Sequence, residues 1–266
     1  MIKIVRAQWY QVIRKKGFWI AFWCFLLLSA GYFLIQSYEN KGQDVYVMSK
    51  ACNYFALMDI GVIGQYFNIL FPILIAFPVA LLSFDENIGK TGIYSEIRCS
   101  SYQFYFAKLI VSFFASFFVV AIPFLFNWIW ITCTFPASTQ TYEGTLNSAM
   151  YFGDSGYDFE VFYKLHPYLY ELLFIVQLSI FAGICSMLAY SIGCYVKKYK
   201  IFIVLPIYIV YFVSNEIGIP HFSMDDYLQC PWEKGSVGGM LQMEVVFLIV
   251  AIVLCVKFAT SRREIQ

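Results

Sequence analysis

Six long apolar runs restrict what this chain of 266 residues can fold into. Most of them approach the ~20 residues that an α-helix needs to cross a bilayer. Charged residues make up 13% of the chain, well below the ~25% of a typical soluble domain. We therefore expect an all-α polytopic membrane protein with six transmembrane helices in a single transmembrane domain, residues 1–266. The runs lie at Phe18–Gln36, Val62–Phe84, Phe104–Ile131, Tyr168–Val196, Ile201–Asn215 and Leu241–Phe258.

The distribution of lysine and arginine predicts how the helices are oriented. If the N-terminus is cytoplasmic, four of the 18 Lys and Arg residues fall outside, at Lys41, Lys50, Lys164 and Lys234, and the others fall inside. Cytoplasmic segments of membrane proteins carry such an excess, and six helices return the chain to its starting side. Both termini are therefore expected in the cytoplasm. The first run follows basic residues, as a signal peptide would, but it exceeds the usual apolar core of about 7–15 residues, so we expect it to be retained.

The segment before the first run has the pattern of an amphipathic helix. Within residues 1–16, basic and polar residues occupy most of the circumference, and apolar residues recur at spacings of three and four. We expect this helix to lie in the inner membrane interface, and the groove of a soluble partner is the alternative. The apolar positions are Ile2, Val5, Trp9, Val12 and Ile13. Outer loops are expected at residues 132–167 and 216–240, and prolines and glycines in the second favour partial re-entry into the membrane.

Three polar residues lie within the predicted spans, at Asn68, Asn127 and Gln177. They can line a translocation path or form hydrogen bonds between helices. Ion-coupled transporters generally carry ionisable residues deep in their spans, whereas this chain has them near the span ends. This pattern argues against a secondary transporter. The ionisable residues concerned are Glu171 and Glu244 near the outer ends, and Lys108 and Lys257 near the inner ends.

The sequence shows no pattern for catalysis or for a metal centre. The eight cysteines lack CxxC spacing, the two histidines fall in outer loops, and neither an HExxH nor a GxSxG motif occurs. We therefore expect no catalytic residue and no metal site in this chain. One outer disulfide among Cys52, Cys133 and Cys230 stays open, because their spacing does not assign a pair.

The tripeptide Gly89-Lys90-Thr91 matches the end of a nucleotide-binding P-loop. A P-loop also requires a glycine five positions before its second glycine, and a preceding strand. Phe84 stands at that position, and a long apolar run precedes the tripeptide. We interpret the match as coincidental.

Residues 85–103 form the longest predicted cytoplasmic segment between two spans, which makes them a natural docking place for a soluble protein. The segment leaves the second apolar run with an acidic pair and passes two glycines before a serine pair. The serines Ser100-Ser101 are a plausible N-cap for the helix that carries Lys108 into the third span. The candidate coupling residues are Asp85, Glu86, Gly89, Lys90, Tyr94, Glu96 and Arg98.

This stretch resembles the corresponding loop of type-2 ATP-binding cassette (ABC) exporter permeases. In that family an acidic residue and a glycine follow the second span, a serine- or proline-rich turn comes next, and a lysine opens the third span. Glu86, Gly89, Ser100-Ser101 and Lys108 match this pattern, although no proline precedes Lys108. The six spans, the amphipathic N-terminal helix and the internal termini match as well.

The resemblance implies the transmembrane permease subunit of an ABC exporter in the bacterial plasma membrane. Residues 85–103 would dock on a separate ATPase subunit, present in two copies, and a second permease subunit, identical or paralogous, would pair with this chain. ATP and Mg would bind the ATPase, so this chain would hold no cofactor and would not itself be an enzyme. Nucleic acid is not an expected partner.

The substrate is less constrained than the class of protein. Aromatic residues make up 21% of the chain, which favours a hydrophobic or amphipathic substrate such as a peptide or an antibiotic, although aromatic side chains facing lipid explain the same number. A non-transporting membrane sensor or assembly scaffold is the alternative function.

Overall fold

The computed structural model describes an α-helical chain. The described residues are 2–45, 48–58, 62–89, 101–137, 165–196, 201–217, 224, 227–228 and 237–264. They form seven α-helices and two short 3-10 helices, η1 (Ala51–Tyr54) and η2 (Ala56–Met58), with no β-strand among them. The all-α prediction is therefore confirmed. The α-helices are α1 (Ile2–Arg14), α2 (Lys16–Glu39), α3 (Val62–Gly89), α5 (Ser101–Thr134), α8 (Pro167–Gly193), α9 (Ile201–Ile217) and α10 (Val237–Glu264).

Each of the six predicted apolar runs coincides with a helix. Four helices, α2, α5, α8 and α10, are long and apolar enough to cross a membrane by length and composition. The apolar parts Ile63–Val79 of α3 and Val204–Glu216 of α9 are shorter. The chain thus has the character of a membrane protein, with four candidate spans among the described residues.

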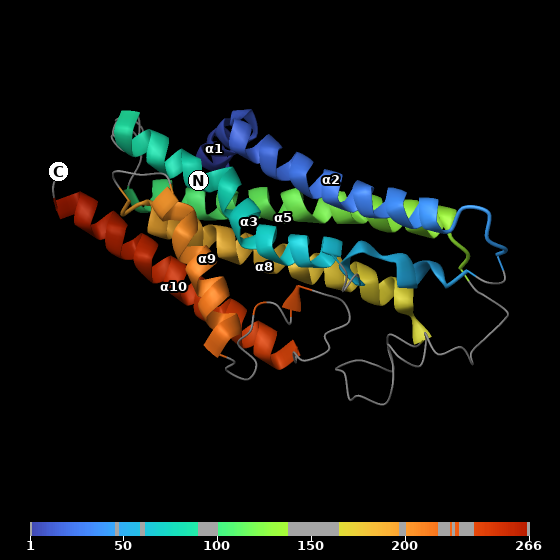
Figure 1. Ribbon diagram of the computed structural model, residues 1–266. Helices are drawn as coiled ribbons and strands as arrows, with labels where there is room; N and C mark the ends of the chain where they lie inside the picture. Colours follow the sequence, from blue (N-terminus) through green and yellow to red (C-terminus); the bar gives the residue numbers. More distant parts are fainter. Residues whose placement is uncertain are drawn as a thin grey trace.

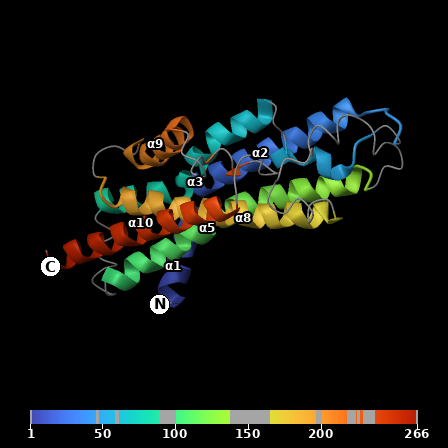
Figure 2. The same ribbon diagram turned by 90° about the horizontal axis from the view of Figure 1, so that it is seen from below.

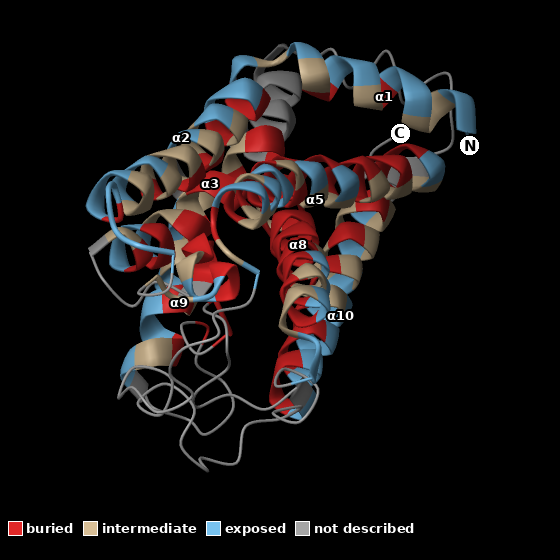
Figure 3. Ribbon diagram, turned by 90° about the vertical axis from the view of Figure 1, so that its right-hand side faces the viewer, coloured by how far each residue is buried: buried red, intermediate tan, exposed pale blue. Residues whose placement is uncertain are grey.

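Helix α8 occupies the centre of the bundle. Figure 3 shows much of this helix buried, with α3, α5, α9 and α10 around it, whereas Leu169, Leu173 and Val176 in its first half are exposed. Small residues on α8 allow these neighbours to approach closely. At Gly183, an added Cβ atom would lie 2.6 Å from Cδ2 of Phe113 on α5. Ala189 packs in a separate small cluster with Ala76 of α3 and Ile207 of α9.

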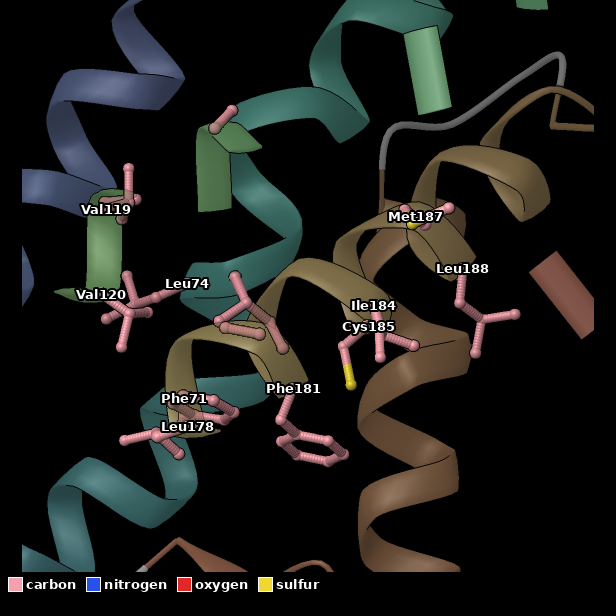
Figure 4. Packing of buried hydrophobic residues seen from close by; sticks show 14 of the residues in the cluster. Phe71, Leu74, Val119, Val120, Leu178, Phe181, Ile184, Cys185, Met187 and Leu188 are labelled. Atoms are coloured by element: carbon pink, nitrogen blue, oxygen red, sulfur yellow. The ribbon is translucent and has the colours of Figure 1, made fainter. Parts of the chain in front are cut away.

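Aromatic side chains fill much of the interior between these helices. Phe67 of α3 contacts Phe124 of α5, with ring centroids 5.4 Å apart. Phe71 of α3 stacks on Phe181 of α8 at 6.2 Å, and Phe181 stacks on Phe247 of α10 at 6.4 Å. Figure 4 shows side chains from α3, α5 and α8 gathered between the three helices. One hydrophobic cluster includes buried residues from all seven α-helices.

Helix α1 lies across the bundle and is joined to α2 by a single residue. Figures 2 and 3 show α1 running across the direction of α2 rather than along it. Of its apolar face, Val12 is buried in the protein and Ile2 is 85% exposed. Gln8 is one of the polar residues that the amphipathic pattern places away from the apolar face, and this placement is wrong. Gln8 is buried, and its amide Nε2 donates to the Phe104 carbonyl at the start of α5, at 3.3 Å.

The segment between α2 and α3 packs against the end of α5. The backbone N–H of Ala51 donates to the Pro136 carbonyl at 3.0 Å, and Tyr54 stacks on Phe135 at 4.3 Å. In Figure 1 this segment lies at the right-hand end of the bundle, whereas both chain termini lie toward the left.

The two predicted outer loops fall largely outside the described residues. Within 132–167, α5 continues to Thr134 and α8 begins at Pro167. Within 216–240, Met224, Tyr227 and Leu228 are buried in the main hydrophobic cluster, so this part of the segment folds back against the helices.

Candidate functional site

Helix α3 extends beyond the predicted end of its span and includes the first coupling residues. The predicted span ends at Phe84, and the helix continues to Gly89, so Asp85, Glu86 and Gly89 are helical. The chain is helical again from Ser101. The predicted cytoplasmic segment 85–103 therefore begins and ends within helices. Lys90, Tyr94, Glu96 and Arg98 lie outside the described residues.

The helical backbone through Gly89 opposes a P-loop. A P-loop wraps phosphate with free backbone N–H groups of an irregular loop that precedes a helix. Residues 84–89 instead belong to α3, whose N–H groups are used within the helix. The geometry agrees with a coincidental match at Gly89-Lys90-Thr91.

The central part of α3 is packed in the core. Phe71, Leu74, Ile75 and Val79 are buried, and α3 packs against α2, α8 and α9. The Ser116 hydroxyl of α5 also donates to the Ile75 carbonyl at 3.0 Å. One continuous helix thus links the candidate coupling residues to the packed interior. Pro72 and Pro78 lie inside that helix.

Asn127 joins three segments instead of facing an open path. The side chain is fully buried on α5. Its Nδ2 donates to the Ser29 carbonyl of α2 at 2.8 Å, and its Oδ1 accepts from the backbone N–H of Ala56 in η2 at 3.2 Å. Of the two interpretations open at the sequence level, these bonds match the one between helices.

Gln177 of α8 also forms a hydrogen bond between helices. Its Nε2 donates to Oε1 of Glu244 on α10 at 2.9 Å, and Glu244 is buried. Asn68 on α3 is also buried, and its Oδ1 accepts no hydrogen bond within the described part of the chain. No hydrogen bond among the described residues links any two of Asn68, Asn127 and Gln177.

Two ionisable residues, Lys108 and Glu171, are more deeply buried than their positions near the ends of the apolar runs suggest. Lys108 of α5 is 5% exposed, and its Nζ lies 4.6 Å from the Phe104 ring centroid and 6.0 Å from that of Tyr190. Aromatic faces attract cations at such distances. Glu171 of α8 is 1% exposed, beside the indole of Trp128, and its Oε1 completes no hydrogen bond with the described residues.

Helical periodicity gives a signal for both residues. Glu171 shares a helix face with Phe174, Ile175 and Leu178, three, four and seven positions later, and all three are buried. Lys108 likewise precedes buried residues at the same spacings, and Phe104 stands four positions before it. Because both residues lie near the ends of the apolar runs, the sequence alone did not indicate that their side chains are buried.

The described residues contain no group of three His, Cys, Asp or Glu side chains that could hold a metal ion. Cys52 is buried in η1, and Cys133 is exposed near the end of α5. Cys230 lies outside the described residues, so the outer disulfide stays open.

Comparison of the chain with family models, curated proteins and solved structures found no match.

Proposed function

We propose that this chain is the transmembrane permease subunit of a bacterial ABC exporter, located in the plasma membrane and crossing it six times with both termini in the cytoplasm. The resemblance of residues 84–108 to the coupling loop of type-2 exporter permeases motivates the proposal. The apolar character of α2, α5, α8 and α10 supports a membrane protein, and α3 and α9 would supply the remaining two spans.

The observation that carries the proposal is the continuity of α3. This helix begins at Val62, packs in the core through Phe71, Leu74 and Ile75, and reaches Asp85, Glu86 and Gly89 without interruption. A partner that pushes on the charged end would therefore move a helix packed against α2, α8 and α9. Residues Lys90 to Arg98 would complete the contact surface.

ATP binding and hydrolysis belong, in this proposal, to two copies of a separate ATPase subunit. The helical backbone of residues 84–89, up to the first residue of the P-loop-like tripeptide, supports placing the nucleotide elsewhere. ATP would close the ATPase pair, and α3 would transmit the motion to the bundle.

The substrate would cross between this chain and a second permease subunit, identical or paralogous. Phenylalanines from α3, α5, α8 and α10 pack in the interior of the single chain. The translocation path of the substrate would therefore lie between the two permease chains. Other aromatic side chains, such as Phe114, Phe118 and Phe126 of α5, are exposed, and a surface of this kind would suit a hydrophobic or amphipathic peptide or an antibiotic.

The test is purification of the chain from its native membrane under mild conditions, with mass spectrometry of its partners. We expect an ATPase with a complete P-loop to co-purify, and the complex to hydrolyse ATP. Substitution of the P-loop lysine in that partner should abolish hydrolysis. A chain that co-purifies with a kinase or an enzyme complex, and with no ATPase, would identify a sensor or scaffold instead.

A further inference from the structure

Exposed cations gather on α1 and the start of α2. Lys3, Arg6 and Arg14 of α1 and Lys16 of α2 are exposed, and we call these four residues the basic face. No Asp or Glu precedes Glu39 in the sequence. The face is therefore a region of positive charge that no carboxylate of the first two helices neutralises.

The basic face is held in place by contacts on the other side of α1. Gln8 and Val12 are buried, and Gln8 is hydrogen-bonded to the Phe104 carbonyl of α5. Trp9 packs edge-on against Phe118 of α5 with ring centroids 6.0 Å apart. These contacts fix the rotation of α1, so that Lys3 and Arg6 project from the bundle.

The junction of α1 with α2 is fixed as well. The Trp19 indole Nε1 donates to the Ile13 carbonyl at 2.8 Å. The Arg14 guanidinium lies over the Tyr10 ring, 4.0 Å from its centroid, and donates to the Tyr10 hydroxyl. A surface ordered in this way needs little rearrangement to bind a ligand.

Aromatic and then aliphatic side chains continue this surface along α2. Trp19, Ile20, Trp23 and Leu27 are exposed, and α2 is one of the helices suited to crossing a membrane. Because α1 runs across α2 where this helix begins (Figure 3), the charged, aromatic and aliphatic parts follow one another along α2. Lysine and arginine followed by tryptophan and then aliphatic residues is the order found at a membrane–water interface.

We propose that the basic face binds the headgroups of anionic phospholipids in the leaflet where α2 begins. Lys3 and Arg6 would contact the phosphates, while Trp19 and Trp23 would lie at the boundary of the acyl chains. Charge complementarity commits the face to an anionic partner, and the apolar continuation along α2 commits it to a lipid. The inference does not depend on the identity of the ATPase partner.

The test measures which phospholipids the purified protein retains. The protein, in whatever complex it forms, is extracted with mild detergent from vesicles containing equal amounts of phosphatidylglycerol and phosphatidylcholine, and retained lipids are quantified by mass spectrometry. We expect phosphatidylglycerol to be enriched severalfold, and the Lys3→Gln/Arg6→Gln variant to lose most of that enrichment. Arg14, Lys15 and Lys16 stay unchanged to preserve the orientation of α2.

Two controls separate charge at this place from charge in general. Lys41→Gln/Lys50→Gln removes two exposed lysines beyond the opposite end of α2, and should retain phosphatidylglycerol like the wild type. Lys3→Arg/Arg6→Lys keeps the charge and should do the same. Equal loss in Lys41→Gln/Lys50→Gln, or no loss in Lys3→Gln/Arg6→Gln, would overturn the assignment.

The wild-type protein supplies a further measurement that does not depend on any variant. Salt screens exposed charges, so the enrichment of phosphatidylglycerol should fall as sodium chloride is raised. An enrichment that does not change with salt would contradict binding by the basic face. Displacement by soluble glycerol phosphate without any lipid preference would identify an anion site and overturn the lipid assignment.

Discussion

At the scale of single residues, the buried polar side chains have structural consequences that their positions in sequence do not reveal. Asn127 bonds to α2 and to η2 from a fully buried position on α5. Glu171 is equally buried but has an oxygen without a partner among the described residues. A buried polar group stabilises a fold when it is hydrogen-bonded and destabilises it when it is not.

We expect Asn127→Ala to destabilise the protein by about 1–3 kcal/mol, because the buried N–H of Ala56 loses its acceptor. Thermal unfolding of the detergent-solubilised chain measures this. Thr132→Val is the control on the same helix, since the Thr132 hydroxyl donates to carbonyls of α5 itself. Similar melting temperatures for the two variants would show that the link between α5, α2 and η2 contributes little.

Glu171→Gln should not destabilise the protein, in contrast to Asn127→Ala. Glutamine keeps the shape of the side chain, and it removes the free-energy cost of keeping an ionisable carboxyl group out of water at a place where one of its oxygens completes no hydrogen bond with the described residues. The variant should therefore unfold at the same or a higher temperature than the wild type. The exposed Glu216 of α9 provides Glu216→Gln as the matched control, which should change nothing. A clear loss of stability in Glu171→Gln alone would mean that the carboxylate is paired in the native membrane.

At the scale of helices, the fold depends on close contact between α5 and α8. Ser112 of α5 and Ser186 of α8 are hydrogen-bonded with their hydroxyl oxygens 3.0 Å apart, and Gly183 lies against Phe113 nearby. Small and hydroxyl residues at a helix interface allow the backbones to approach.

Gly183→Ala should weaken this interface, because the new Cβ would stand 2.6 Å from Cδ2 and 3.0 Å from the carbonyl oxygen of Phe113. The phenyl ring can move but the backbone oxygen cannot easily do so, so Phe113→Leu should rescue the variant in part. Gly31→Ala on α2 is the control: nothing lies within 4 Å of its added Cβ, and alanine favours a helix by about 1 kcal/mol over glycine. Melting temperatures should thus fall for Gly183→Ala and stay or rise for Gly31→Ala. Equal behaviour of the two alanine variants would contradict the tight packing at Gly183.

At the scale of the whole molecule, the sequence predicted the elements better than their contacts. Apolar runs located all six long helices, because length and hydropathy are local properties. The predicted second span ends at Phe84, five residues before the end of α3. Asp85 and Glu86 were interpreted as the start of a loop, although neither residue breaks a helix. The hydrogen bonds of Asn127 and Gln177 could not be predicted, because each depends on how distant segments pack. Gln8 was misplaced for the same reason.

The continuity of α3 leads to a prediction about coupling in the proposed exporter. Proline in a helix interior removes a hydrogen bond and clashes with the preceding turn. Because α3 continues through Pro72 and Pro78, we expect Asn87→Pro to kink the helix between its packed part and Gly89, while Asn87→Ala would preserve its direction. We expect both variants to insert and assemble normally, because the buried residues from Phe71 to Val79 are unchanged. Substrate-stimulated ATPase activity and transport by the complex should fall severalfold in Asn87→Pro and stay near wild type in Asn87→Ala.

Substitutions at the end of α3 and in the following segment test the same coupling independently of the helix backbone. Glu86→Ala and Tyr94→Asp alter the expected contact with the ATPase and leave α3 free to continue as a helix. A carboxylate beside a cationic group of a partner contributes on the order of 1 kcal/mol or more when it is partly desolvated, so the loss of Glu86 should loosen docking and reduce coupling severalfold. If Asn87→Pro uncouples the complex while Glu86→Ala and Tyr94→Asp do not, α3 transmits motion from a contact made elsewhere on the chain. If all three variants transport and hydrolyse ATP at wild-type rates in assembled complexes, α3 and residues 85–98 do not couple the ATPase to the bundle.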